Sequence, residues 1–270
     1  MPDRTPLRPI RLTRRLDRED HAPTMTRRIY PKPPIVEAVI EFHFQVTTDA
    51  NELAHALGSA LAHRYDADVR QHDLFEISAS DAGGGVSTSA RRVPHMFFLR
   101  SASGLRQLGC GRSALSVHTL APYPGWESFL EQAYEAVGVL PELVRQAPIN
   151  RIAIRYLDLL RLPPREELIN FITVVPSPPD GMPSLLTNYH YFTQSQDQDD
   201  HTVVQLTVTN APDAGASGPG LLYDLALVRS GDPLSSFDSE HWVPHVESMH
   251  TRLRHIFESS ITDKTRELFQ

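Results

Sequence analysis

The sequence lacks the features that mark several classes of protein. Its 270 residues contain one cysteine, Cys110, which excludes an intrachain disulfide and a cysteine-based metal site. No hydrophobic run reaches the ~18 residues that a membrane span needs, and no apolar signal-peptide segment follows the N-terminal arginines. These absences predict a soluble protein of the cytoplasm, where thiols stay reduced.

Common nucleotide-binding and catalytic motifs are also missing. The sequence contains no P-loop, no G-x-S-x-G and no H-E-x-x-H. Gly109, Gly111 and Ala114 have the spacing of a dinucleotide-binding fingerprint, which requires a helix immediately after a strand. The segment that follows, "ALSVHTL", alternates like a strand instead. Gly111 and Arg112 therefore indicate a hairpin turn, and no cofactor is expected.

The thirteen histidines do not form a recognisable metal-binding pattern. His241 and His245 are four residues apart, but Pro244 lies between them and no third ligand can be identified. Glu52 and His55 form one half of a carboxylate-helix metal site without the other half. We therefore predict no metal site.

Lysine is scarce and charge is unevenly distributed. Arginine supplies 24 of the 26 basic residues. Residues 1–28 hold eight arginines and four acidic residues, whereas the remainder carries 18 basic and 29 acidic residues, a net charge of −11. An acidic body argues against a broad nucleic-acid-binding face, which needs clustered cations. Residues 1–28 are expected to be a disordered Arg-rich arm, and nucleic-acid binding through this arm is one alternative function.

Hydrophobic periodicity predicts an α+β protein built from two tandem β-α-β-β-β-α units, with antiparallel sheets covered by helices. The first unit spans residues 29–148. It begins with a strand over 35–46, followed by a helix with Asp49 and Glu52 in a capping box. Short extended segments and a second helix from Trp126 complete this unit. The extended segments lie near 70–79, 95–102, 105–110 and 113–119.

The second unit spans residues 149–270 and repeats this order. "NRIAIRYLDLLRLPP" is predicted to be a strand and "PREELINFITVV" a helix. Extended segments follow near 185–196, 201–210 and 220–229. A long C-terminal helix is expected from Val243 to Phe269, with Pro244 in its first turn. The apolar stripe of this helix shifts from Leu253 to Phe257 and Ile261, so that one row can cover the sheet and the other can face a copy of the helix in a homodimer; the sequence leaves the oligomeric state open.

The first strands of the two units carry the charged residues of greatest interest. Glu37 and Glu41 lie on one face of the strand that begins the first unit, opposite its apolar face. Arg151 and Arg155 lie on the polar face of the strand that begins the second unit, and Asp158 is the one polar residue on its apolar face. A pseudo-two-fold axis would place the glutamates opposite the arginines. This ladder is either solvated or part of a cleft that selects an anionic or zwitterionic ligand.

Four segments together resemble a known family over about residues 29–270. They are "YPKPPIVEAVIEFHF", "APYPGWESF", "INRIAIRYLDLLRLP" and "MHTRLRHIFESSITDKTRELF". The family is a sporadically distributed bacterial group of uncharacterised proteins without an assigned activity. Its pattern includes Tyr156, but it commonly has Asn where this chain has Asp158. The resemblance implies an accessory role in a mobile-element or defence-type locus.

We expect a non-enzymatic binding or regulatory component that recognises a protein partner or a small anionic ligand in the cleft between the units. The candidate binding residues are Glu37, Glu41, Arg151, Arg155 and Tyr156. The alternative is an enzyme acting on an anionic small molecule. In that case Glu37 or Glu41 would be the general base, and the two arginines would hold the anion.

Overall fold

The computed structural model describes most of the chain beyond the Arg-rich arm. The described residues are 28–66, 69–81, 86–163, 166–175, 181, 189–197, 199–211 and 220–270, with no side chains described within 72–95. The predicted disorder of residues 1–27, and nucleic-acid binding through them, therefore lie outside the described residues. So does the start of the extended segment predicted at 185–196.

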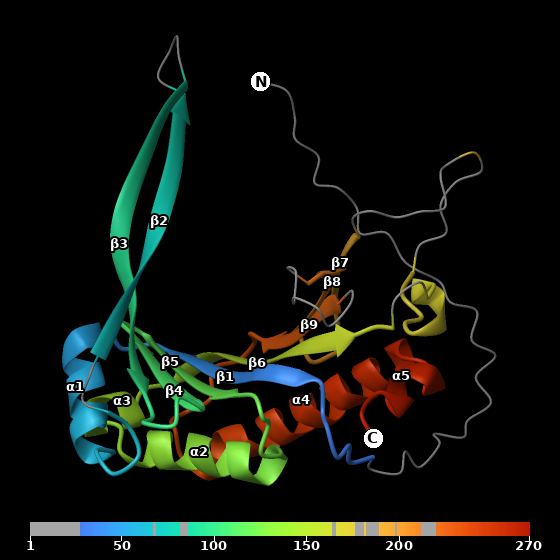
Figure 1. Cartoon of the computed structure of the whole chain (residues 1–270). Helices are drawn as coiled ribbons and strands as arrows, with labels where there is room; N and C mark the ends of the chain where they lie inside the picture. The colour runs from blue at the N-terminus through green and yellow to red at the C-terminus, as the bar shows by residue number, and fades with distance from the viewer. Residues whose placement is uncertain are drawn as a thin grey trace.

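The chain folds as a mixed α+β protein with one large antiparallel sheet and, among the described residues, five α-helices (Figure 1). The elements up to residue 148 are β1 (Ile35–Phe44), α1 (Ala50–Ala60), β2 (Val69–Asp81), β3 (Val86–Arg100), β4 (Arg106–Gly111), β5 (Ala114–Leu120), α2 (Trp126–Gly138) and α3 (Glu142–Arg145). The later elements are β6 (Ile149–Arg161), the 3-10 helix η1 (Leu168–Asn170), β7 (His190–Gln196), β8 (Thr202–Asn210), β9 (Gly220–Arg229), α4 (Ser239–Ser260) and α5 (Asp263–Glu267).

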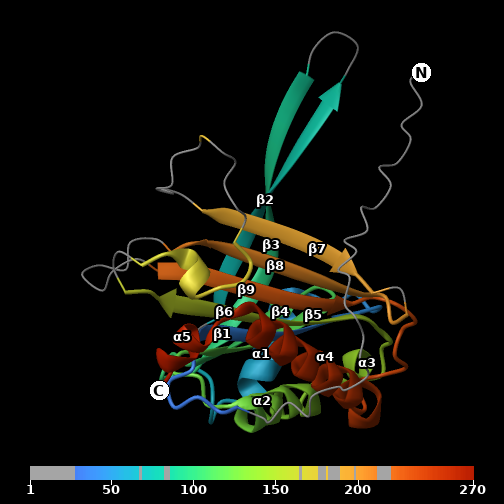
Figure 2. The same ribbon diagram turned by 90° about the vertical axis from the view of Figure 1, so that its right-hand side faces the viewer.

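The nine strands of the described residues join in the order β2-β3-β4-β5-β1-β6-β9-β8-β7. The first strands of the two halves, β1 and β6, are therefore central neighbours in one sheet, and they pair antiparallel. Figures 1 and 2 show all five α-helices on one face of this sheet, which we call the helix face. The opposite face, the open face, carries no α-helix among the described residues. None of the described helices is long and apolar enough to cross a membrane.

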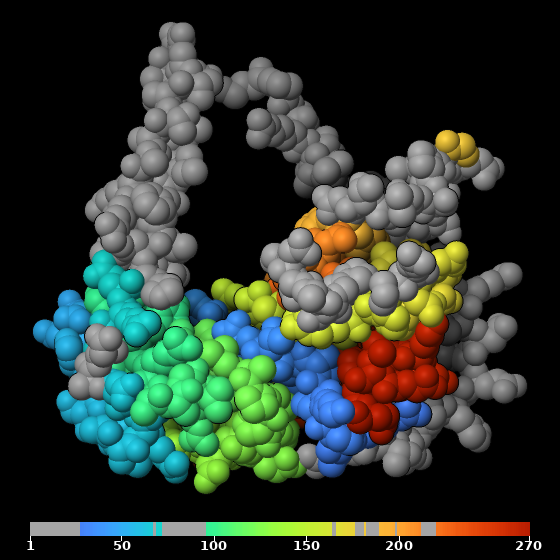
Figure 3. All heavy atoms as spheres, viewed as in Figure 1, coloured from blue at the N-terminus to red at the C-terminus, as the bar shows by residue number. Residues whose placement is uncertain are grey.

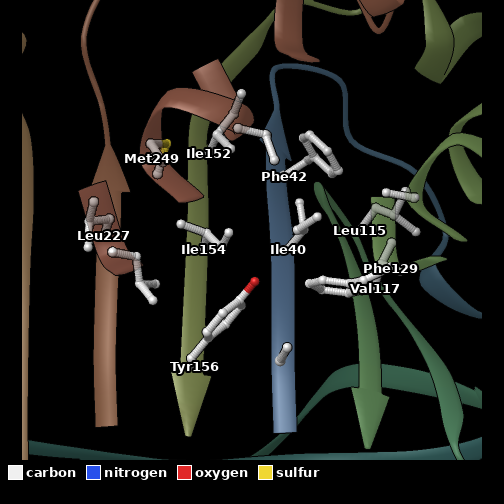
Figure 4. Close-up of a cluster of buried hydrophobic side chains, with 14 of the residues drawn as sticks. Ile40, Phe42, Leu115, Val117, Phe129, Ile152, Ile154, Tyr156, Leu227 and Met249 are labelled. Carbon is white, nitrogen blue, oxygen red and sulfur yellow. The ribbon is translucent and has the colours of Figure 1, made fainter. Parts of the chain in front are cut away.

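The hydrophobic core lies between the sheet and the helices (Figure 4). The predicted alternation in β1 and β6 is confirmed, because Ile40, Phe42, Ile152 and Ile154 are all fully buried on the helix face. Burial of each such side chain contributes roughly 1.5 to 3 kcal/mol relative to exposure. α1 covers one end of the sheet, and the Asp49 carboxylate caps it by accepting from two backbone amides, as its sequence predicts.

The hairpin predicted at Gly111 and Arg112 is also present, one residue later than predicted: Gly111 ends β4, and Arg112 and Ser113 form the two-residue turn to β5. The dinucleotide-binding alternative is therefore excluded at this position, because no helix follows β4.

Two helix predictions in the second half are wrong. The segment 164–175 contains only the short η1 among its described residues, and the predicted helix from Val243 to Phe269 starts earlier and is interrupted. One tertiary contact lies at both sites, where the predicted helices are absent or interrupted: Ile261 is extended and forms an isolated β-bridge with Ile172. Thr262 then caps a separate helix, α5. Since α4 begins at Ser239, Pro244 lies inside it rather than in its first turn.

Candidate functional site

Four of the five predicted binding residues lie together on the open face. Glu37 and Glu41 come from β1, and Arg151 and Arg155 come from β6. They line a hollow of about 330 Å³ over the β1–β6 seam. His118 of β5 and Asp224 of β9 complete its charged lining. We call this set the open-face cluster.

The pairing within the open-face cluster differs from the predicted ladder. The register places Val39 opposite Arg155 and Ala153 opposite Glu41, so glutamates and arginines are offset. Arg155 instead donates two hydrogen bonds to the Asp224 carboxylate, at 2.7 and 2.6 Å. Glu41 remains within 3.9 Å of Arg151.

Histidines hold both glutamates of the cluster in their ionised form. His118 Nδ1 lies 2.9 Å from Glu37, and His43 Nε2 lies 2.6 Å from Glu41. These hydrogen bonds lower the pKa of each carboxyl group, although burial opposes the shift. A carboxylate with a lowered pKa is a weak base near neutral pH, which argues against either glutamate as a general base.

Glu37, His118 and Ser116 form a hydrogen-bonded chain in the order of an acid, a base and a hydroxyl nucleophile. Because Glu37 is ionised, His118 Nδ1–H donates to it, and in the neutral imidazole His118 Nε2, 2.8 Å from Ser116 Oγ, accepts from the hydroxyl. Ser116 is only 1% exposed, however, and a Cβ added at Gly109 would lie 2.3 Å from its Oγ. No substrate carbon can reach this oxygen, so the chain positions Glu37 rather than forming a catalytic triad.

Tyr156, the fifth predicted binding residue, lies on the helix face, away from the other four (Figure 4). Its hydroxyl is 3.0 Å from the Tyr123 hydroxyl and 2.9 Å from His250 Nδ1. Burial raises the pKa of Tyr156 well above its ordinary value, so the phenol stays neutral. The five predicted residues therefore belong to two separate sites.

The second site is a pocket of about 290 Å³ between residues 28–35, the start of α2, β6 and α4. We call it the aromatic pocket, because Tyr30, Tyr123, Trp126, Tyr156, His250 and Phe257 line it. The rings of Trp126 and His250 stack with centroids 3.8 Å apart and an interplanar angle of 3°. The Tyr30 hydroxyl donates to Glu258 at 2.7 Å. These contacts fix the walls in place without an added ligand.

Residues far apart in sequence build this pocket. In Figure 3 the first described residues, in blue, lie between the green α2 region and the red C-terminal region. Each of the four segments singled out in the sequence contributes at least two residues to the wall: Tyr30 and Pro33, Tyr123 and Trp126, Tyr156 and Asp158, and His250 and Phe257.

Asp158 lines the aromatic pocket and is 3% exposed. Its position as the one polar residue on the apolar face of β6 is confirmed. Within the described part of the chain its carboxyl group has no hydrogen-bond or ion-pair partner. Burial, and secondly the charge of Asp224, raise its pKa to about 8. The sequence pattern located Asp158 but did not indicate a site, because the surrounding walls come from distant segments.

Neither the geometry of possible metal ligands nor the comparison with known proteins assigns a function to this chain. Among the residues that the structure describes, no group of three or more His, Cys, Asp or Glu side chains could hold a metal ion. His241 lies near Ser236 and Glu240 rather than in such a group. A scan against protein-family models and a search of curated proteins found no match to this chain.

Proposed function

We propose that this chain is a non-enzymatic binding protein that holds a small ligand in the aromatic pocket. The pocket lies between residues 28–35, the start of α2, β6 and α4, and it is not the cleft expected from the sequence, whose four charged residues line the open-face hollow. The single observation that carries the proposal is Asp158, a residue that is 3% exposed at this pocket and whose carboxyl group has no hydrogen-bond or ion-pair partner among the described residues.

The physical argument rests on the cost of burying that carboxyl group. A buried polar group without a partner costs roughly 1 to 3 kcal/mol, and an ionised group costs more. A ligand that pairs with Asp158 would remove this cost on binding. The surrounding rings offer large apolar area and already have fixed orientations, so little conformational entropy is lost when a ligand binds.

We also propose that the architecture consists of two related units joined through β1 and β6, although the described elements differ from the predicted β-α-β-β-β-α order: four strands lie between α1 and α2, and only η1 lies between β6 and β7. The strand order supports this division, because β5 flanks β1 as β9 flanks β6. A helix follows each flanking strand, α2 after β5 and α4 after β9. The resemblance to the sporadic bacterial family, and the accessory role that it implies, stay predictions.

Homodimerisation through the C-terminal helix also stays a prediction, but its sequence argument is weakened. Phe257 packs against Tyr223 and Phe269 of its own chain, at centroid distances of 5.3 and 6.3 Å. Ile261 is 3% exposed. The apolar row that would face a partner is therefore covered within the protomer. Light scattering of the purified protein measures the oligomeric state directly.

An enzyme acting through the open-face cluster is the second candidate. The hollow gathers carboxylates, guanidinium groups and His118 over the β1–β6 seam, which is a suitable lining for an anionic substrate. The lowered pKa values of Glu37 and Glu41 count against it. Substitutions of Asp158 and of Arg155 separate these two candidate functions, because Asp158 lines only the aromatic pocket and Arg155 only the open-face hollow.

The test is native mass spectrometry of the protein purified from its own cells, beside Asp158→Asn and Arg155→Met variants. We expect a small molecule that co-purifies with the wild type and with Arg155→Met but not with Asp158→Asn. Loss from Arg155→Met alone would place the site on the open face. Bare protein in all three samples would contradict the binding proposal, and circular dichroism checks that each variant is folded.

A further inference from the structure

We infer that the aromatic pocket selects a small organic cation, an ammonium or guanidinium group attached to an apolar part, whose positive charge meets Asp158. This inference rests on the proposed function and specifies its ligand class. It would make Asp158 the residue that determines which ligand is bound.

The first support is the position of Asp158 among aromatic rings. Its carboxyl group is buried at the β6 side of the pocket, where Tyr123, Tyr156 and Trp126 lie close by. Rings of tyrosine and tryptophan attract cations through their faces, most strongly where water is excluded. A cation that reaches Asp158 would gain both a charged hydrogen bond and this ring contact.

The second support is the distribution of the other charged groups around the pocket. Arg254 lines the pocket, is half-buried and donates to the backbone carbonyl of Arg28 at 3.0 Å. Its charge lowers the pKa of Tyr123 and Tyr156, but it is not among the charges that shift the pKa of Asp158. Glu258 is already hydrogen-bonded to Tyr30 and Arg266. The titratable or charged residues that line the pocket together with Asp158 are Arg28, Tyr30, Tyr123, Glu127, Tyr156, His250, Arg254 and Glu258. Tyr223 pairs with Asp158 in the β6–β9 ladder, and Asp224 acts on it from across the sheet.

These neighbours make the inner end of the pocket favourable to positive charge. Asp224, although paired with Arg155, adds negative potential from the opposite face of the sheet, whereas Arg254 is tied to the backbone carbonyl of Arg28 and does not shift the pKa of Asp158. A ligand with an amine at one end would therefore bind with that end inward. Any acidic group that it carries would lie toward Arg254.

The ionisation of Asp158 gives the inference a measurable signature. Because the pKa of Asp158 is about 8, its carboxyl group is mostly protonated near neutral pH. A bound cation favours the carboxylate and lowers that pKa, so binding releases a proton. Affinity should rise by up to about tenfold per pH unit from about pH 6 and level off above about pH 8. The amine probe itself stays charged up to about pH 9.

The probe is phenethylamine, compared with two molecules of the same shape, the neutral 2-phenylethanol and the anionic 3-phenylpropionate. Isothermal titration calorimetry in buffers of different ionisation enthalpy measures affinity and proton release together. We expect the amine to bind at least about tenfold tighter than the alcohol and to release close to one proton at neutral pH. Asp158→Asn should remove this preference. Glu131→Gln, an acid-to-amide change on the exposed side of α2, should not.

Tighter or equal binding of the alcohol or the propionate would overturn the cation inference while leaving the pocket as a binding site. Amine binding that is unchanged in Asp158→Asn, or without proton release, would also overturn it. If none of the three probes binds, the inference fails, and the co-purification experiment decides separately whether the pocket holds any ligand.

Discussion

Replacing Asp158 by asparagine should make the protein more stable at neutral and alkaline pH but should change little near about pH 4. Asparagine keeps the shape of the side chain and removes its ionisation. The folded-state pKa of about 8 lies above the ordinary value of 3.8, so the folded protein retains a proton that the unfolded chain releases. The stability of the wild type should therefore fall as pH rises through this window, and Asp158→Asn should remove that part of the fall.

The size of the expected stability difference follows from the pH range between the unfolded-state and folded-state pKa values of Asp158. Each pH unit between the two pKa values changes the free energy of unfolding by up to about 1.4 kcal/mol. From about pH 5 to pH 8 the ceiling is therefore about 4 kcal/mol, and we expect about 2 to 4 kcal/mol because water penetration reduces the shift. This is a large part of the 5 to 15 kcal/mol typical of folded domains, so the effect is measurable.

The assay is urea unfolding of the wild type and the variant at several pH values, followed by circular dichroism. The difference between the two curves isolates Asp158, because all other titrating groups are shared. Glu247→Gln, at an exposed position of α4, is the matched control and should run parallel to the wild type. If the free energy of unfolding of Asp158→Asn ran parallel to that of the wild type at every pH, the carboxyl group of Asp158 would not have a raised pKa. The main support for the proposed site would then be lost.

Three other substitutions test separate contacts by their effect on unfolding in urea. Gly109→Ala should cost about 1 to 3 kcal/mol, because the new Cβ would lie 2.3 Å from Ser116 Oγ at a close approach of β4 and β5. Thr262→Ala should cost about 1 kcal/mol, because its hydroxyl caps α5. Arg155→Met should cost about 1 kcal/mol or less, because its pair with Asp224 is partly exposed and screened.

Each of these expectations can fail in a specific way. A Gly109→Ala variant as stable as the wild type would mean that the two strands separate easily at this point. An unchanged unfolding midpoint for Thr262→Ala would contradict the capping role. A loss of several kcal/mol in Arg155→Met would mean that the pair is far better shielded from water than its exposure indicates.

The sequence predicted the parts of this fold that depend on local patterns. Alternation in β1 and β6 follows directly from residue order, as does the capping residue Asp49. The centre of the sheet and the face on which each charged residue lies could therefore be predicted. The hydrogen-bond partners of these charged residues could not be predicted. Glu37 pairs with His118, which is 81 residues away, and the register that brings them together is fixed by the whole β1–β5 ladder.

The same limit explains the aromatic pocket. Periodicity identified Asp158 as an exception on an apolar face, but it did not bring Tyr30, Trp126 and His250 to the same place. The wrong helix prediction near residue 170 is a similar case, because the bridge between Ile172 and Ile261 is a tertiary contact that local propensity does not include. Two signals pointed to this site: the polar Asp158 in an otherwise apolar strand, and the four segments singled out in the sequence, each of which contributes residues to the pocket wall.

The central position of β1 affects how the chain can fold during synthesis. Its pairing with β5 closes a loop of roughly 70 residues, and its pairing with β6 closes one of roughly 100 residues, so both contacts raise the contact order and slow folding. On the ribosome, β1 and β5 emerge before β6 is complete. Until β6 arrives, one edge of β1 has no strand beside it and can pair with another nascent chain. Ribosome-bound chains that stop before β6 should therefore depend on chaperones more than chains that include it.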